Sequence, residues 1–238
     1  MPECSIITET DVHAKMTPQA LLYLLSLVSP SLPVGAYAYS QGLEYAVQKQ
    51  WINNEAECLD WISGVYRFGF AATDLPIGWR LHRSWTQASI QAVDYWNAYL
   101  WAFRESKQIQ MQEQHLAGAL AKLLDSLHVP EAAQWQKREQ RCFLSLYTLA
   151  AVHWHIPADA ALLGLSFSWV ENLVLAAVRL IPLGHTAGQR ILHELIPIVT
   201  EEVYAKQTID DAFIGQNLPG SQLAMIQHEQ LYSRLFRS

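Results

Sequence analysis

The chain contains 238 residues with a mass of 27.0 kDa, of which 51% are hydrophobic and only 16% charged, and its formal net charge is −6. It has no cluster of lysine and arginine of the kind that neutralises phosphate groups, so we expect no nucleic-acid partner. The low charge and the nine tryptophans predict instead that part of the surface binds other proteins.

The cysteines and the N-terminal residues indicate the compartment. Three cysteines without a CxxC spacing argue against a disulfide framework and against a thiolate zinc site. The first residues carry acidic side chains where a signal peptide has a basic region followed by about 7–15 apolar residues. We therefore expect a cytoplasmic protein.

Apolar residues recur at helical spacing along almost the whole chain, and no segment shows a convincing strand pattern. The sequence therefore predicts an all-α fold, a single-domain bundle of roughly eight to ten helices. Thr17 before Pro18, and Asn54 three residues before Glu57, are typical helix starts. Helix breaks are expected at prolines, Pro76 among them, because proline lacks a backbone donor. The predicted helices are 17–28, 37–50, 55–71, 75–89, 91–104, 106–127, 131–154, 158–180 and 185–205.

The segment 160–183 approaches the ~20 apolar residues that a membrane-spanning helix needs. Glu171, Asn172 and Arg179 interrupt it, and a charge at the centre of a span costs roughly 2.5–3.5 kcal/mol on insertion scales. We therefore expect a buried core helix and no membrane partner.

Motifs for catalysis, nucleotide binding and metal binding are absent or weak. The patterns GxSxG, SxxK, HExxH and GxxxxGK[ST] do not occur. On a helix, His153 and His155 point roughly 200° apart, and His185 and His193 lie ~12 Å apart along an axis. We expect no enzyme, no cofactor and no metal site within one chain. A site shared across a dimer axis, or a catalytic site assembled only in space, is not tested by these patterns.

The helical pattern changes near Ile209, where glycine, proline and polar clusters begin. We therefore divide the chain into a helical domain, residues 1–208, and a C-terminal docking tail of the same domain, residues 209–238. A short, partly apolar segment at a chain end is typical of one that is ordered by binding a partner.

Aromatic and basic residues alternate at the end of this tail. Tyr232, Leu235 and Phe236 are spaced so that one helical turn places them on a single face, and Arg234 and Arg237 flank that face as partners for acidic groups. We expect this face to bind a partner and its loss to cost the fold little. The alternative is that the tail packs back on its own domain.

In three segments, helix packing alone does not explain which residues are present. These segments are SPSLPVGAYAYSQGLEYA at 29–46, RLIPLGHTAGQRIL at 179–192 and HEQLYSRLFRS at 228–238. In this order and at these positions they resemble the UreF family of urease accessory proteins. The resemblance spans nearly the whole chain. Two departures are His185, where the family usually has glutamine, and residues 104–106, which match an arginine- and glutamate-rich stretch only in part.

The resemblance implies an all-α homodimer that binds the UreD/UreH scaffold protein and, through that complex, the GTPase UreG, so that nickel is delivered into apo-urease. The partner-binding residues expected in the third segment are His228, Glu229, Tyr232, Ser233, Arg234, Leu235, Phe236 and Arg237. The interface or structural residues expected in the first two segments are Pro33, Gly35, Ser40, Gly42, Glu44, Arg179, Pro182, Gly184, Gly188 and Gln189.

The alternative hypothesis is a nickel-binding metallochaperone that uses histidines across a dimer interface. His153, His155 and His228 are its candidate ligands. Stoichiometric nickel binding that is lost when these histidines are replaced would favour it over the adaptor hypothesis.

Overall fold

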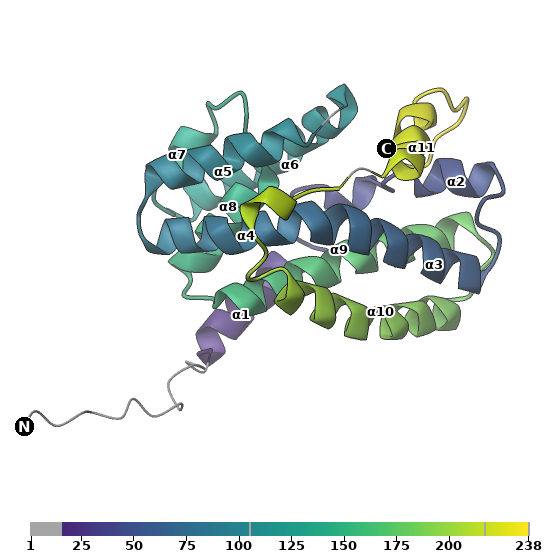
Figure 1. The fold of residues 1–238 in the computed structure, drawn as a ribbon, viewed down its shortest axis with the longest axis horizontal. Helices are drawn as coiled ribbons and strands as arrows, with labels where there is room; N and C mark the ends of the chain where they lie inside the picture. The colour runs from purple at the N-terminus through teal and green to yellow at the C-terminus, as the bar shows by residue number, and fades with distance from the viewer. Residues whose placement is uncertain (1–15, 105, 217, 238) are drawn as a thin grey trace, which may run out of the picture.

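The computed structural model describes residues 16–104, 106–216 and 218–237, and every regular element within them is helical (Figure 1). The all-α, single-domain prediction is therefore confirmed. A π-helical turn, η3 (Tyr66–Phe70), and two 3₁₀ turns, η2 (Ala36–Ala38) and η4 (Asp211–Phe213), accompany the α-helices. The α-helices are α1 (Pro18–Leu27), α2 (Leu43–Gln48), α3 (Glu55–Val65), α4 (Ala71–Thr86), α5 (Ile90–Ala102), α6 (Lys107–Ser126), α7 (Ala132–Trp135), α8 (Phe143–His153), α9 (Ala158–Leu180), α10 (His185–Ala205) and α11 (Pro219–His228).

Helix α9 lies at the centre of the bundle and packs against α1, α2, α3, α4, α8 and α10. Among the described residues it is the one helix long and apolar enough to cross a membrane, yet half of its most apolar 18-residue stretch is buried inside the protein. Its polar Asn172 donates hydrogen bonds to the backbone carbonyls of Tyr39, at 3.0 Å, and Ala36, at 3.4 Å. Helix α9 therefore serves as a core helix.

The predicted helix starts are confirmed by their capping contacts. The Thr17 hydroxyl accepts a hydrogen bond from the Ala20 amide at 3.1 Å, and the Asn54 side-chain oxygen accepts one from the Glu57 amide at 3.0 Å. Each bond satisfies one of the amides that the first helical turn leaves without a partner.

The helix break predicted at Pro76 is wrong. Helices α3 and α4 and the π-helical turn between them form one continuous run, and Pro76 lies inside α4. The proline cannot donate to the carbonyl of Ala72, four residues earlier. That carbonyl instead accepts a hydrogen bond from the Gly215 amide at 2.9 Å, so the segment that follows α10 supplies the missing donor.

Two predicted helices are shorter than expected. The one predicted at 37–50 begins only at Leu43, because Gln41 and Gly42 both adopt left-handed backbone angles, with φ of 53° and 78°. The one predicted at 131–154 is interrupted between α7 and α8. There the Arg141 guanidinium donates to the carbonyls of Gln136 and Arg138, which lie in the loop between the two helices.

Candidate functional site

The three segments singled out in the sequence lie at one end of the bundle (Figure 1). Helix α11 packs on α2, and α2 packs on α9. The start of α10 is tied to the start of α3 by Arg190, whose guanidinium donates two hydrogen bonds to the Glu55 carboxylate, at 2.8 and 2.6 Å. The fold thus gathers segments from the two ends of the chain and from its interior.

Glu44 joins the first segment to the third. Its carboxylate is buried and accepts three hydrogen bonds: one from the Leu235 amide at 2.6 Å, one from the Phe236 amide at 3.0 Å, and one that pairs it with Nε2 of His228 at 2.6 Å. A further backbone bond, from the Arg237 amide to the carbonyl of Ala38 at 2.7 Å, fixes the last described residue. The tail is therefore held in place by the protein's own N-terminal segment.

The single helical face predicted for the tail is wrong. Helix α11 ends at His228, and the following backbone turns to give its amides to Glu44. As a result Phe236 is buried in the core and His228 has no exposed surface, whereas Tyr232 is fully exposed and 64% of Leu235 is exposed. The alternative, a tail that packs on its own domain, describes Phe236 and His228. The remaining predicted residues, Glu229, Ser233, Arg234 and Arg237, are exposed.

Helix α11, which precedes these residues, also has exposed apolar side chains. Leu223 and Ile226, on the outward side of α11, are about half exposed. We use the term tail surface for Leu223, Ile226, Tyr232, Arg234, Leu235 and Arg237. An apolar centre with arginines beside it is the composition that protein interfaces favour.

Gly42 marks the place where α2 and α11 cross. A Cβ atom there would lie 3.0 Å from both the Ala224 Cβ and the Met225 amide nitrogen, so only glycine permits this approach. Gly35 has the same φ of +78° but open space around it, so its glycine is needed for the turn alone. Ser40 is buried beside the start of α2, where its hydroxyl accepts a long hydrogen bond of 3.4 Å from the Glu44 amide, and Pro33 is exposed.

Most of the interface residues expected in the second segment are exposed. Gly188 is the exception: a Cβ atom there would lie 2.7 Å from Cγ2 of Val178, so the glycine lets α10 approach α9 closely. The other expected residues, Arg179, Pro182, Gly184 and Gln189, are exposed and have no packing role that would explain them. Their side chains are therefore accessible to a binding partner at this end of the bundle.

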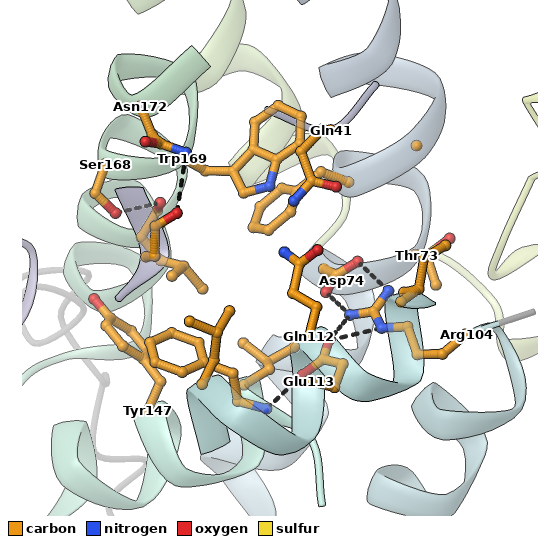
Figure 2. A pocket seen from close by; sticks show the side chains of 18 of the residues that line it. Gln41, Thr73, Asp74, Arg104, Gln112, Glu113, Tyr147, Ser168, Trp169 and Asn172 are labelled. Atoms are coloured by element: carbon orange, nitrogen blue, oxygen red, sulfur yellow. Dashed lines mark hydrogen bonds and ion pairs between the residues drawn. The ribbon is translucent and has the colours of Figure 1, made fainter. Parts of the chain in front are cut away.

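Helix α11 contributes to the lining of a cavity of about 240 Å³. Figure 2 shows side chains that line it. Its walls are largely apolar, with Phe70 and Trp169 on one side, and Ser221, Gln222 and Met225 of α11 contribute to another. Two unusual backbone features border it: the π-helical turn that contains Phe70, and the left-handed residue Gln41. Such features are enriched at functional sites, which makes the cavity a second part of the candidate site.

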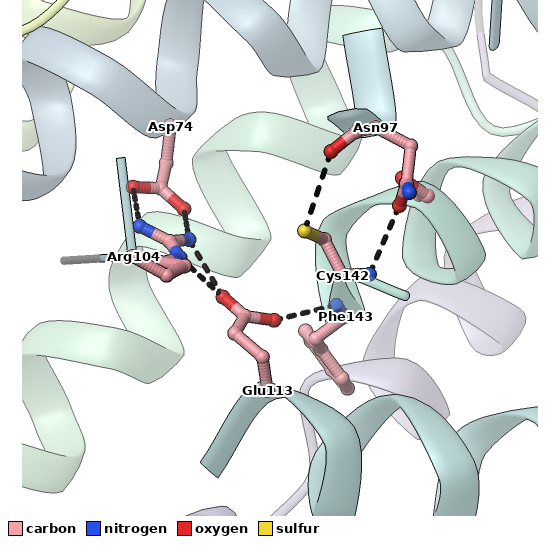
Figure 3. A network of polar contacts seen from close by, with 7 residues as sticks. Asp74, Asn97, Arg104, Glu113, Cys142 and Phe143 are labelled. Atoms are coloured by element: carbon pink, nitrogen blue, oxygen red, sulfur yellow. Dashed lines mark hydrogen bonds and ion pairs between the residues drawn. The ribbon is translucent and has the colours of Figure 1, made fainter. Parts of the chain in front are cut away.

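A buried ionic network forms one wall of this cavity (Figure 3). The Arg104 guanidinium lies between two carboxylates, 2.5 Å from Asp74 and 2.7 Å from Glu113. The second oxygen of Glu113 accepts a hydrogen bond from the Phe143 amide at 2.7 Å, at the start of α8. The network thus joins α4, α6 and α8 through Arg104, which follows α5.

Burial by itself lowers the pKa of Arg104, but the two carboxylates outweigh it and leave that pKa above its usual range. Burial, and then the charge of Glu113, raise the pKa of the neighbouring Cys142 thiol. This network was not predicted from the sequence. The feature of the sequence that could have indicated it is the presence of two acidic residues, Asp74 and Glu113, at positions that the helical pattern assigns to the interior.

The histidines of the metallochaperone hypothesis lie apart. His153 and His155 are at the end of α8, while His228 is buried against Glu44. Within the described parts of the chain, no three His, Cys, Asp or Glu side chains are close enough to hold a metal ion.

Comparison with known proteins agrees with this arrangement. The family model for UreF matches residues 52–196. The chain belongs to the UreF family. The protein named urease accessory protein UreF from Hahella chejuensis is 45% identical over 223 residues, which cover 94% of this chain and all of that relative. The relative of the same name from Alkalilimnicola ehrlichii is 43% identical over 90% of this chain and 94% of its own length. A third, from Chromohalobacter salexigens, is 39% identical over 96% of this chain and 99% of its own length.

The resemblance seen in the three segments is therefore confirmed. As a UreF protein, the chain is a urease accessory protein and not itself a catalyst. The matched range ends before the tail, whereas the alignment with the Hahella relative covers almost the entire chain.

Proposed function

We propose that this UreF protein is a cytoplasmic adaptor that presents its tail surface to the UreD/UreH scaffold protein and, within that complex, recruits the GTPase UreG during nickel insertion into apo-urease. The observation that supports this most is the exposure of Tyr232 and Leu235 on a backbone that Glu44 holds in place. An anchor that is already ordered loses less conformational entropy when it binds than a flexible one.

The charge around these anchors favours a particular kind of partner surface. Arg234 and Arg237 are exposed beside Leu235, and neither takes part in an ion pair among the described residues. An apolar pocket with acidic groups at its rim would complement this arrangement, because arginine contributes most at interfaces when it meets a carboxylate.

Size-exclusion chromatography of the purified proteins tests the proposal. The scaffold should elute together with this chain, and the GTPase should join the complex only when both are present. A chain whose tail surface is disrupted by Tyr232→Asp should no longer carry the scaffold. If the scaffold elutes separately from the unaltered chain at micromolar concentration, the adaptor role is wrong.

We further propose that the chain is a homodimer that pairs through α1. Leu21, Leu22 and Leu25 are 43, 67 and 54% exposed on one side of this helix. No charged residue occurs from Met16 to Leu43. In a two-fold interface each surface meets its own copy, so an apolar surface without charge is self-complementary whereas a charged one is repelled. Helix α1 also lies well away from the tail surface, which leaves that surface available (Figure 1).

Leu22→Asp is expected to convert the dimer to a 27.0 kDa monomer at micromolar concentration, because it places two like charges in the interface. Sedimentation velocity measures the change. The control is Phe213→Asp, which alters a residue that is 73% exposed on a different surface and should leave the dimer intact. An unaltered chain that sediments as a monomer over this range would contradict the proposal.

A further inference from the structure

The proposed adaptor function gives no role to the cavity of about 240 Å³. Protein interiors are close-packed, and voids much larger than a water molecule are few. A cavity of about 150 Å³ with apolar walls is large enough to bind benzene. The cavity in this protein therefore has room for a molecule of about two fused rings.

The charges in the cavity wall compensate one another. Asp74, Arg104 and Glu113 are the charged residues among the described residues that line it. Arg104 lies between the two carboxylates, and Glu113 also accepts the Phe143 amide at the start of α8, where the helix dipole favours negative charge. A charged ligand would lose its hydration without gaining a counter-ion. The wall therefore favours an uncharged ligand.

Aromatic rings line two parts of the wall. Phe70 and Trp169 have ring centroids 5.1 Å apart, and those of Phe143 and Tyr147 are 6.0 Å apart. Phe70 ends the π-helical turn η3, a feature that is frequent at functional sites. Trp169 and Tyr147 lie on different sides of the open space in Figure 2. Such walls favour an aromatic ligand, which gains stacked or edge contacts with them.

One polar group in the wall is available to a ligand. Ser168, Asn172 and Tyr147 each donate to a backbone carbonyl, so their donors are used within the fold. The Gln41 carboxamide has no hydrogen-bond partner among the described residues, and Figure 2 shows it directed into the cavity. Its backbone has a left-handed φ of 53°, which costs free energy in a residue other than glycine and is typical of functional positions.

We propose that the cavity binds a small uncharged aromatic molecule of about two fused rings, and that Gln41 forms a hydrogen bond with an N–H or O–H group at the edge of the ring. The carboxamide oxygen accepts this bond. The site uses none of the residues of the tail surface, and it does not depend on the proposed adaptor function.

Isothermal titration calorimetry of the full chain with three indoles tests the ligand class. Indole should bind with 1:1 stoichiometry. We expect 1-methylindole to bind at least fivefold more weakly, because it lacks the N–H group, and indole-3-acetate at least tenfold more weakly, because it is charged. Absence of saturable indole binding at millimolar concentration overturns the proposal. Equal affinity for indole and indole-3-acetate overturns the uncharged class.

Gln41→Asn tests the polar contact. Asparagine tolerates the left-handed backbone but withdraws the carboxamide by one methylene group. The variant should bind indole at least fivefold more weakly and 1-methylindole as before. The matched control is Gln50→Asn, because Gln50 has a similar φ of 61° but is exposed outside the cavity lining. If Gln41→Asn still prefers indole to 1-methylindole, Gln41 does not form the contact.

A second pair of variants tests the location. Val65 lines the cavity, so Val65→Trp should fill part of it and abolish indole binding. Phe68→Trp alters an exposed residue of the same helical run and should leave the affinity unchanged. If Val65→Trp reduces the helical content, Leu32→Trp fills the cavity from a loop and provides the same test. Unchanged indole binding in a folded cavity-filling variant overturns the site.

Titration in the presence of saturating scaffold protein distinguishes a free molecule from a partner's side chain. Indole affinity that stays within twofold of its value for the chain alone supports a free ligand. Loss of indole binding in the complex means that a scaffold side chain fills the cavity, and it overturns the proposal. A scaffold that fails to bind overturns the adaptor function only, since the indole series and the variants still decide whether the site exists.

Discussion

Replacing Arg104 with methionine is expected to destabilise the protein by about 3–5 kcal/mol, which is a large part of the ~5–15 kcal/mol that stabilises a typical domain. Methionine retains most of the apolar contact, so the loss arises from charge. Asp74 and Glu113, whose side chains are 9 and 10% exposed, would remain as two buried negative groups without a cation between them. Urea unfolding followed by far-UV circular dichroism measures the change in midpoint.

Two controls separate this effect from a general sensitivity to loss of arginine. Arg190→Met breaks the exposed pair with Glu55 and should barely move the midpoint. Adding Asp74→Asn and Glu113→Gln to Arg104→Met should restore part of the lost stability, because the triple variant buries no unpaired charge. If Arg104→Met unfolds at the same urea concentration as the unaltered protein, the network does not stabilise the fold.

Adjacent residues of the tail should give opposite results when they are replaced by alanine. Phe236→Ala removes a buried ring and is expected to cost about 3–5 kcal/mol of stability. Leu235→Ala and Tyr232→Ala alter exposed side chains, so they should leave the unfolding midpoint in place and weaken scaffold binding at least tenfold, or ~1.4 kcal/mol. Calorimetric titration with the scaffold and urea unfolding measure the two quantities.

This pattern replaces the expectation that the tail can be removed at little cost to the fold. Deleting residues 228–238 would strip Glu44 of all three donors and remove Phe236 from the core. We therefore expect the truncated chain to lose stability as well as binding. A truncation that retains the full unfolding midpoint, or a Phe236→Ala variant that fails only in binding, would contradict the positions of these side chains.

The sequence by itself determined the helical class, the helix starts at Thr17 and Asn54, and the family. Each of these depends on neighbours within a few positions, because helical periodicity and capping are local and the three family segments are contiguous. The order of those segments was visible, and so was the unusual composition of the tail. None of these features requires knowledge of which distant residues meet.

The tertiary structure decided everything that depends on a contact between distant segments. Pro76 stays within a helix because the distant Gly215 amide supplies the bond that the proline leaves open. Phe236 turns inward because Glu44, 192 positions earlier, binds its backbone. Arg104, with Asp74 and Glu113, forms a buried network that joins different helices. Local propensity cannot indicate such partners, since a buried polar group is satisfied by whichever donor or acceptor the packing brings to it.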